Sequence, residues 1–297
     1  ALPPPSLSST AQSSDINYAA HPYRWVVLAG AWLAYVCFGM TVGSLAPLVL
    51  PIMRELAISH SAFGTILGAW PLVYIAAAAA CGALTDRMGP RRTLVLALLV
   101  IAASGALRGI AEGYAGLFIG VAVFGLGGPL VSIGAPKLVS LWFVGKDRGL
   151  AMGIYTTGSA LGLVISLSAT NSVFMPLMNG NWRQVMFLYA GFALTACAIW
   201  FAIGCHPAAR ALDRRLAAEP RLRQMELFAN LIKLREVQLI LLMSLGIFFL
   251  NHALNSWLPE ILRTGGMDLR SAGFWAAIPT AVGIAAALLI PRLATPR

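Results

Sequence analysis

The most concentrated chemistry in this sequence lies in the stretch GALTDRMGPRR, residues 82–92, where one acid and three arginines stand between two long apolar runs. Asp86 can pair with a cation, or it can meet a helix N-terminus, where the helix dipole favours a carboxylate. Gly89 permits a tight turn, because glycine readily adopts a positive φ. Arginines alone would suffice to orient a membrane protein, but that purpose needs no Asp. The pattern therefore predicts a charged turn that makes specific contacts at a membrane surface.

Lys137, in the stretch GAPKLVSLWF, is the one unambiguous charge inside an apolar run. A charge within a bilayer is costly, so such a residue either has a function or lies close enough to the surface to reach water. Pro136 precedes it and frees a backbone carbonyl one helical turn earlier. Since no carboxylate lies deep in any of the apolar runs, we expect Lys137 to lack an acidic partner in this chain and to attract a substrate anion. The alternative is that it only helps to set orientation.

Polar side chains also gather on one face of the apolar run 237–258. At 100° per residue, Ser244 lies within about 40° of Asn251 and Asn255, and His252 is beside them. A polar stripe on an otherwise apolar helix indicates a water-filled interior. We therefore expect substrate-binding residues here: Asn251, His252 and Asn255. Hydrogen bonding between helices, without any ligand, is the alternative.

Two tyrosines complete the candidate binding residues. Tyr35 lies near the middle of the first apolar run, and Tyr155 shares a helical face with three small or polar residues, Ser159, Gly162 and Ser166. Aromatic packing is the alternative for both tyrosines. Gly149 and Gly153 lie on the opposite side of the same helix, where close packing against a neighbouring helix is expected.

Other kinds of chemistry are not supported by the sequence. The four cysteines, Cys37, Cys81, Cys197 and Cys205, fall in or at the ends of apolar runs without metal-ligand spacing, so no metal and no cofactor is expected. No phosphate-binding loop motif occurs. Ser244 and His252 are poorly placed as a nucleophile and its base, so an enzyme is not expected. A channel is a second alternative, although no segment resembles a selectivity filter.

The elements that must position these residues are membrane helices. The chain of 297 residues is 59% hydrophobic and only 11% charged, which is too apolar for a soluble domain. About 20 apolar residues cross a bilayer as a helix. The charge-free runs predict an all-α membrane protein with eight such helices, near 25–50, 62–84, 93–111, 115–143, 149–176, 185–205, 237–258 and 271–290. Arg108, at the end of a shorter run, is expected to extend outward to the surface.

Basic residues predict the orientation of these helices. With the N-terminal tail in the cytoplasm, fifteen of the 21 Lys and Arg residues fall on the cytoplasmic side and five on the other side, as the positive-inside rule requires. The excess positive charge thus reflects topology, and nucleic acid is not an expected partner. Residues 1–24 read as a disordered tail, 25–205 as a six-helix bundle and 206–236 as a cytoplasmic linker. Its last part, 226–236, is amphipathic and is expected to lie among lipid headgroups.

The stretch at residues 82–92 resembles the loop motif between helices 2 and 3 of the major facilitator superfamily. Gly-x-Leu-x-Asp-Arg-x-Gly-x-Arg-Arg matches at Gly82, Leu84, Asp86, Arg87, Gly89, Arg91 and Arg92. Residues 142–162 also resemble the stretch from helix 4 to helix 5 of that family. Its twelve-helix plan of two similar halves fits a faint repeat, in which 237–297 looks like the start of a second half.

The resemblance implies a bacterial inner-membrane carrier, acting as a monomer, that moves a small solute by alternating access. It also implies that Gly82, Asp86, Arg87, Gly89, Arg91 and Arg92 form a gating motif, and that four more helices would follow this apparently truncated chain. The last two helices look most like the cyanate-permease branch, and the nitrate–nitrite-porter branch is the other one that the chain resembles. Both suggest a small organic or inorganic anion, with a proton as a candidate co-substrate. The chain departs from the family where Val121 replaces a common Arg, and no Gly-Pro pattern marks an antiporter.

Overall fold

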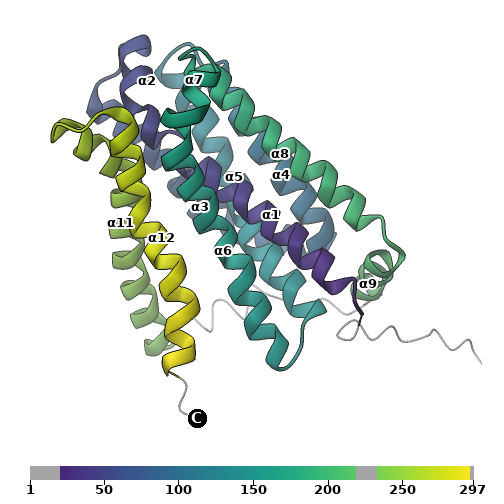
Figure 1. Ribbon diagram of the computed structural model, residues 1–297. Coiled ribbons are helices and arrows are strands. Elements are labelled where there is room, and N and C mark those ends of the chain that lie inside the picture. Colours follow the sequence, from purple (N-terminus) through teal and green to yellow (C-terminus); the bar gives the residue numbers. More distant parts are fainter. Residues whose placement is uncertain (1–20, 219–232, 295–297) are drawn as a thin grey trace, which may run out of the picture.

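The computed structural model describes residues 21–218 and 233–294, and every regular element in these ranges is a helix (Figure 1). The all-α fold class is therefore confirmed. In chain order the elements are α1 (Arg24–Gly43), η1 (Ala46–Leu48), α2 (Val49–Leu56), α3 (His60–Met88), α4 (Pro90–Gly109), α5 (Tyr114–Trp142), α6 (Lys146–Ala169), the π-helical turn η2 (Thr170–Phe174), α7 (Met175–Leu177), α8 (Trp182–Gly204), α9 (Pro207–Ala218), α11 (Arg235–Thr264) and α12 (Leu269–Ala294).

Eight helical segments follow the apolar runs of the sequence. Seven of them are long and apolar enough to cross a membrane, the first combining α1, η1 and α2, and α12 is the eighth long helix. Helices are the expected solution, because a spanning segment must satisfy its backbone hydrogen bonds internally. Polar residues cap some of the ends: the Ser59 hydroxyl accepts from the Ala62 N–H at 3.2 Å, and the Asn181 side chain accepts from the Arg183 N–H at 2.9 Å.

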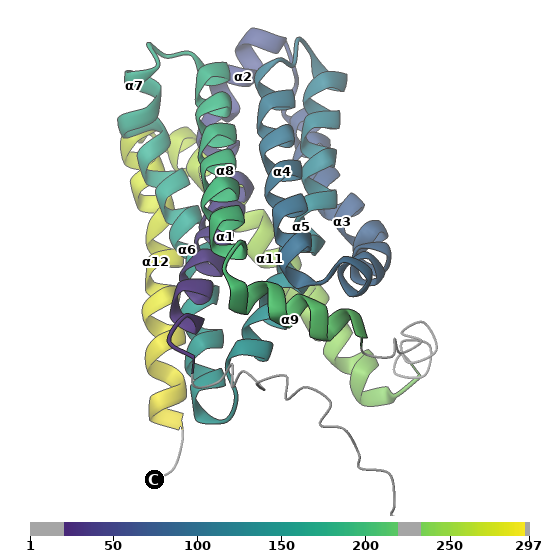
Figure 2. The same ribbon diagram turned by 90° about the vertical axis from the view of Figure 1, so that its right-hand side faces the viewer.

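The long helices run between two ends of the molecule (Figures 1 and 2). One end carries the turn between α3 and α4, the start of α1, and α9, and it is termed the motif end. The other end carries α2, α7 and the turn between α11 and α12, and it is termed the opposite end. Because α3 and α5 begin at the opposite end, their C-terminal residues, including Asp86 and Lys137, come to the motif end.

Close packing of α1 against α6 forms one wall of the bundle. A Cβ atom added at Gly158 or Gly162 would overlap a backbone oxygen of α1, and one added at Gly39 would overlap a backbone oxygen of α6. Small residues let membrane helices approach in this way. The expectation that Gly149 and Gly153 serve this purpose is wrong, because no atom lies within 4 Å of a Cβ added there. The packing face is set instead by Gly158 and Gly162, which lie three residues after Tyr155 and Ser159, respectively.

The first span is broken, although the sequence predicts one helix over residues 25–50. After Gly43 the Ser44 N–H bonds back to the Thr41 carbonyl at 3.4 Å, in a tighter turn than an α-helix, and η1 follows. Pro47 lies within η1 and cannot donate a backbone hydrogen bond, so the α-helical ladder cannot pass through it. The break separates α1 from the short helix α2.

Arg108 does not extend outward, and this expectation is also wrong. Its side chain turns into the bundle, where the residue is only 2% exposed. Its Nη1 atom donates to the Ser44 hydroxyl at 2.9 Å and to the Thr41 carbonyl at 3.3 Å. The end of α1 provides hydrogen-bond acceptors for the arginine, and a sequence pattern cannot show their position.

A short helix missing from the sequence-based expectations, α9, crosses the motif end below α8 (Figure 2). Its Ala208, Ala209 and Leu212 are buried against the bundle. The amphipathic segment expected at 226–236 lies mostly outside the described residues, as does nearly all of the tail expected at 1–24.

The pair α11–α12 approaches the bundle most closely toward the opposite end. The residues of α11 that are buried, Ser256, Pro259 and Glu260, all belong to its last part, whereas Leu242, in its first part, is 67% exposed. We term the contacts between this pair and the bundle at that end the opposite-end seal. They include a contact between His60 Nε2 and Glu260 Oε1 at 3.7 Å.

Backbone contacts complete the opposite-end seal. The side-chain amide of Asn171 in η2 donates to the Pro47 carbonyl at 3.0 Å and to the Leu269 carbonyl at 3.4 Å. A Cβ added at Gly273 in α12 would overlap the backbone oxygen of Leu167 in α6. Three segments that are far apart in the sequence, η1, η2 and the start of α12, therefore meet at this end.

Candidate functional site

The turn between α3 and α4 has the conformation expected from its glycine. Gly89 has a φ of 82°, a value that favours glycine, and it ends α3 while preceding α4. Its N–H donates to the Thr85 carbonyl at 2.9 Å, and its carbonyl accepts from the Thr93 N–H at 3.1 Å. Pro90 then occupies the first position of α4, where a missing N–H costs nothing. The turn thus places Asp86 and Arg91 on two different helices at the motif end.

Asp86 makes an ion pair with Lys137 across the gap between α3 and α5. The side chains are 23% and 37% exposed, so the pair lies near the surface of the motif end and not deep in the bundle. The expectation that Lys137 has no acidic partner in this chain is wrong. The sequence motif predicts that Asp86 belongs to a charged turn. Its place on the last turn of α3, level with Lys137, follows only from the packing of α3 on α5.

Arg91, in the first turn of α4, contacts α9 and the end of α8. Its Nε atom lies 2.5 Å from Asp213 Oδ2 in α9, and its Nη1 donates to the Gly204 carbonyl at 2.8 Å. The indole N–H of Trp200 donates to the backbone carbonyl of Arg91 at 3.0 Å. Asp213 is a partner that the sequence analysis missed, because nothing in the linker indicated that α9 would fold back onto α4.

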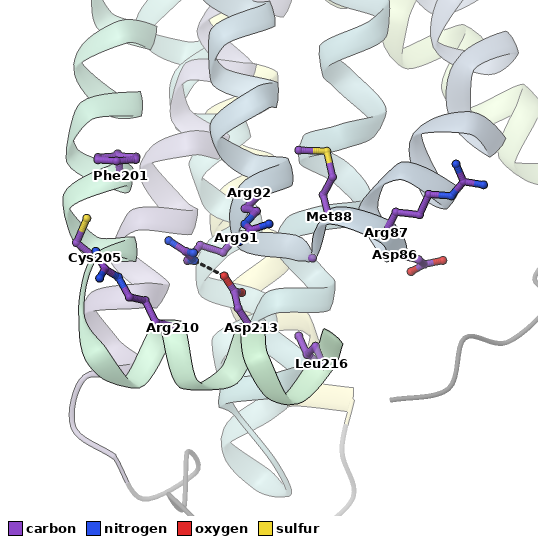
Figure 3. Close-up of a pocket in the computed structure, with 11 residues that line it drawn as sticks. Asp86, Arg87, Met88, Arg91, Arg92, Phe201, Cys205, Arg210, Asp213 and Leu216 are labelled. Carbon is purple, nitrogen blue, oxygen red and sulfur yellow. Dashed lines mark hydrogen bonds and ion pairs between the residues drawn. The ribbon is translucent and has the colours of Figure 1, made fainter. Parts of the chain in front are cut away.

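A pocket of about 500 Å³ lies between the charged turn and α9 (Figure 3). It is lined by Asp86, Arg87, Met88, Gly89, Arg91, Arg92, Phe201, Cys205, Arg210, Asp213 and Leu216. Arg91 points toward Asp213, whereas Arg87 points away from this pair, on the far side of the turn. With four arginines and two acids, one of which pairs with Lys137, the pocket is electropositive. Of the six predicted gating residues, five line it, and Gly82 lies further back in α3.

A second group of candidates lies near the middle of the helices, where the bundle faces α11. Trp70 of α3 has its ring 5.4 Å from the ring of His252 in α11 and 5.5 Å from that of Phe124 in α5. The Tyr74 hydroxyl bonds to the Ser132 hydroxyl at 2.5 Å. We term this group, Trp70, Tyr74, Phe124, Ser132 and His252, the mid-level cluster. It combines apolar rings with hydroxyl and imidazole groups from both sides of the interface.

The structure separates the polar residues predicted on α11. His252 faces Trp70 in the bundle, whereas the Asn255 amide donates to the Asn251 carbonyl oxygen at 2.6 Å. Asn255 also accepts from the Thr280 hydroxyl of α12 at 3.2 Å. Asn255 therefore links α11 to α12, whereas Asn251 bonds to Asn255 within α11.

The predicted tyrosines contact each other. Tyr35 of α1 and Tyr155 of α6 have their ring centroids 4.9 Å apart in an edge-to-face arrangement, and the residues are 9% and 6% exposed. They lie at the tight α1–α6 contact, beside Phe38, whose ring stacks on Phe124 at 5.4 Å. The two tyrosines therefore connect to the mid-level cluster through the ring of Phe38. Trp70, which the sequence alone does not single out, enters the site because it faces α11.

No group of three or more His, Cys, Asp or Glu that could hold a metal ion occurs within residues 21–218 and 233–294. The described cysteines are free, and three of them are buried among apolar side chains. The side chains of both groups of candidates offer hydrogen bonding, ring stacking and ion pairing.

Known proteins with similar sequences belong to one family of membrane transporters. Residues 31–297 match the sequence profile described as the Major Facilitator Superfamily. The chain is 29% identical over 288 residues to the uncharacterized transporter YycB of Bacillus subtilis (strain 168), covering 92% of this chain and 66% of that protein. It is 28% identical over 263 residues to a probable L-galactonate transporter of Escherichia coli (strain K12), covering 83% of this chain and 56% of that one.

Among solved structures, a bacterial homolog of the human lysosomal transporter Spinster, in an inward-facing and unoccupied conformation, superposes with a TM-score of 0.71 at 18% identity. The match covers 92% of this chain and 64% of that one, and it shows a shared fold. The chain thus spans between half and two thirds of the length of these relatives.

Proposed function

Because the chain belongs to the major facilitator superfamily, we propose that the full-length protein is a secondary active transporter that moves a small solute across a membrane by alternating access. The observation that carries the proposal is the mid-level cluster. Its rings and polar groups come from α3 and α5 on one side and from α11 on the other. A site shared by two bodies that meet near the middle of a membrane is what alternating access requires, because rocking one body against the other exposes the site to each side in turn.

We place the motif end in the cytoplasm of a bacterial cell, with the N-terminus on that side and the protein in the inner membrane. The excess of Lys and Arg at that end supports this orientation. The opposite-end seal then closes the external side, and the molecule is open toward the cytoplasm. The bundle over 25–205, the linker 206–236 and the start of a second bundle at 237–297 are the parts that would move against each other.

The substrate that we propose is a small organic anion of the sugar-acid class. The relative named as a probable L-galactonate transporter supports this class over cyanate or nitrate. The mid-level cluster also suits such a molecule: its hydroxyl and imidazole groups can bond to the hydroxyls of a sugar acid, and its aromatic rings can pack on the C–H faces. Asn251, His252, Asn255, Tyr35 and Tyr155 remain the candidate binding residues, with Trp70 and Tyr74 added.

Lys137 belongs, in our proposal, to the gating motif. Its ion pair with Asp86 holds α3 to α5 at the motif end, and Arg91 holds α4 to α9. An ion pair at a moving end can break in one state and form in the other, which is how such a motif would bias the two states. Arg87 and Arg92 line the same pocket and are available to the second half of the protein when that end closes.

Proton coupling is a further part of the proposal, with His252 as the candidate group because its imidazole faces the mid-level cluster. We also propose that the protein works as a monomer in the lipid bilayer, without nucleic acid and without enzymatic activity. A channel is the competing class, and it differs in two observable properties: a channel gives neither saturable uptake nor counterflow.

The test is uptake of radiolabelled L-galactonate into vesicles that contain the purified full-length protein. The proposal expects saturable uptake and faster uptake when the vesicles are preloaded with unlabelled substrate. Linear uptake without counterflow would favour a channel. Saturation with a neutral sugar but not with a sugar acid would retain the transporter and refute the substrate class.

A further inference from the structure

Arg108 is a charged residue buried inside the bundle, and no acid in the described part of the chain balances it. It is 2% exposed, and no ion pair joins it to any acid within residues 21–218 and 233–294. Its Nε atom is buried without any hydrogen-bond partner. A buried cation without an acidic partner is costly, so its position must stabilise something that a neutral side chain would not.

The acceptors that Arg108 does reach belong to one place, the end of α1. The Thr41 carbonyl accepts from Arg108 Nη1 at 3.3 Å and from the Ser44 hydroxyl at 2.9 Å, and the same Nη1 reaches the Ser44 hydroxyl. The C-terminal carbonyls of a helix carry partial negative charge and favour a cation. Arg108 thus acts as a cap for α1, supplied by another helix, at the point where the first span breaks.

The room for this contact is made by neighbouring helices. A Cβ added at Gly120 of α5 would come within 3.1 Å of the Arg108 side chain. The Ser104 hydroxyl bonds to the Gly120 carbonyl at 2.7 Å and holds α4 close to α5. The Arg108 guanidinium carbon lies 5.5 Å from the ring centroid of Phe124, which gives the cation an aromatic face. The site is therefore built around the arginine.

The segment just after the break is part of the opposite-end seal. Ala46 packs with Leu163 and Leu167 of α6 and with Ala277 of α12 in one buried cluster. The next residue, Pro47, accepts a hydrogen bond from Asn171, which also bonds to Leu269 at the start of α12. The direction in which the chain leaves α1 thus decides whether these groups can meet.

We propose that Arg108 is a positioning residue that holds the break in the first span and so keeps the opposite-end seal closed. It touches no candidate binding group other than the ring of Phe124. Its loss frees the end of α1, lets η1 leave the contact with α12, and shifts the molecule toward the state that is open at that end. The inference rests on the proposed alternating access, but its readout requires no substrate.

The experiment measures how fast a buried position in the seal becomes accessible. Ala277, 4% exposed, is replaced by Cys in a full-length protein whose native cysteines are replaced by Ser. Intact cells and inside-out vesicles are treated with a membrane-impermeant maleimide. Arg108→Gln is expected to speed labelling about tenfold, since hydrogen bonds to a charged group would be lost from one state only. Arg108→Lys, which keeps the charge, is expected to restore part of the protection.

Arg270→Gln is the matched control, because Arg270 is an exposed arginine at the same end, and labelling at the parent rate is expected. Parent-rate labelling of Arg108→Gln at normal abundance would overturn the proposal. If Arg108→Gln fails to accumulate, Ser44→Ala decides: it removes one acceptor of Arg108 and should speed labelling about threefold, and no change would equally overturn the proposal. Labelling in vesicles but not in cells would refute the proposed orientation and leave the role of Arg108 intact.

Discussion

Lys137 and Arg108 are two cations on neighbouring membrane helices, and the structure treats them in opposite ways. Lys137, near the motif end of α5, pairs with the carboxylate of Asp86 and remains 37% exposed. Arg108, on α4 near the opposite end, is buried, and its guanidinium lies against a carbonyl, a hydroxyl and an aromatic ring. The sequence alone predicts the reverse: a Lys137 without a partner and an Arg108 that reaches water.

The difference indicates what each end of the molecule is built to do. A partly exposed ion pair between two side chains is weak and can exchange partners when helices move. A cation held against the end of a helix depends on the path of the backbone, so it can be lost only if the backbone changes course. We infer that the motif end carries contacts that are made and broken in each transport cycle, whereas Arg108 fixes the geometry of the other end.

The largest effect is expected for Asp86→Asn. The change leaves Lys137 without its acid and removes the acidic group from the gating motif. Because both side chains are partly exposed, we expect the interaction free energy between them to fall by about 1–2 kcal/mol. This corresponds to roughly a tenfold lower initial uptake rate. Initial uptake rates in vesicles with equal amounts of full-length protein measure it. Glu112→Gln, a change at an exposed acid at the other end, serves as the control, and an uptake rate for Asp86→Asn equal to this control would contradict the role.

Lys137→Gln tests whether this lysine belongs to the gate or to the substrate. If it serves only as the partner of Asp86, the turnover number should fall about fivefold while the Michaelis constant stays nearly unchanged, because ground-state binding is unaffected. Lys137→Arg should keep most of the activity, since an arginine can also pair with the carboxylate. A rise in the Michaelis constant alone would show that Lys137 binds the substrate anion directly.

A charge exchange sharpens the same comparison. The double variant Asp86→Lys, Lys137→Asp restores an ion pair of reversed direction, so it should transport about threefold better than Asp86→Lys alone. The same kind of rescue is not available to Arg108, whose acceptors are backbone and hydroxyl groups. Equal activities of the single and double variants would indicate that the Asp86–Lys137 pair contributes nothing to transport.

The smallest effect is expected at the contact between α4 and α9. Asp213→Asn weakens the ion pair with Arg91 but leaves the bond from Arg91 to the Gly204 carbonyl. We expect a loss of about 1 kcal/mol, seen as a fall of a few degrees in the thermal midpoint of the solubilised protein, with transport little changed. Arg210→Gln, which alters the same pocket away from this pair, should leave the midpoint unchanged. A loss of transport as large as that of Asp86→Asn would place α9 inside the gate.

Much of the fold could be predicted from the sequence because a bilayer leaves few choices. Long apolar runs must become helices, and the runs at 115–143 and 185–205 correspond to α5 and α8 within a few residues. The break after Gly43 was not predicted, because Pro47 near the end of a run reads equally well as the end of a helix. The course of α9 was missed because its docking depends on the Arg91–Asp213 contact between distant segments.

For the candidate site, the sequence predicts several candidate residues but not which residues contact one another. The motif identified the turn, and its glycine has the positive φ that the turn requires. The partner of each residue depends on how the helices pack. Lys137 contacts Asp86, and His252 contacts Trp70, because their helices are neighbours and the residues lie at the same level along them. Helical angles alone place Asn251, His252 and Asn255 in one group. In the structure His252 contacts α3, whereas Asn255 contacts α12.

The central claim is that the two ends open in alternation, and pairs of spin labels at both ends of the full-length protein test it directly. Cysteines for one pair replace Ser61 and Gly265 at the opposite end, and those for the other replace Gly149 and Glu236 at the motif end; all four positions are exposed. Distances are measured by electron–electron double resonance with and without L-galactonate and at two pH values. The account predicts that any condition that lengthens the distances at one end shortens those at the other. Distances that stay fixed, or that lengthen at both ends together, would contradict it.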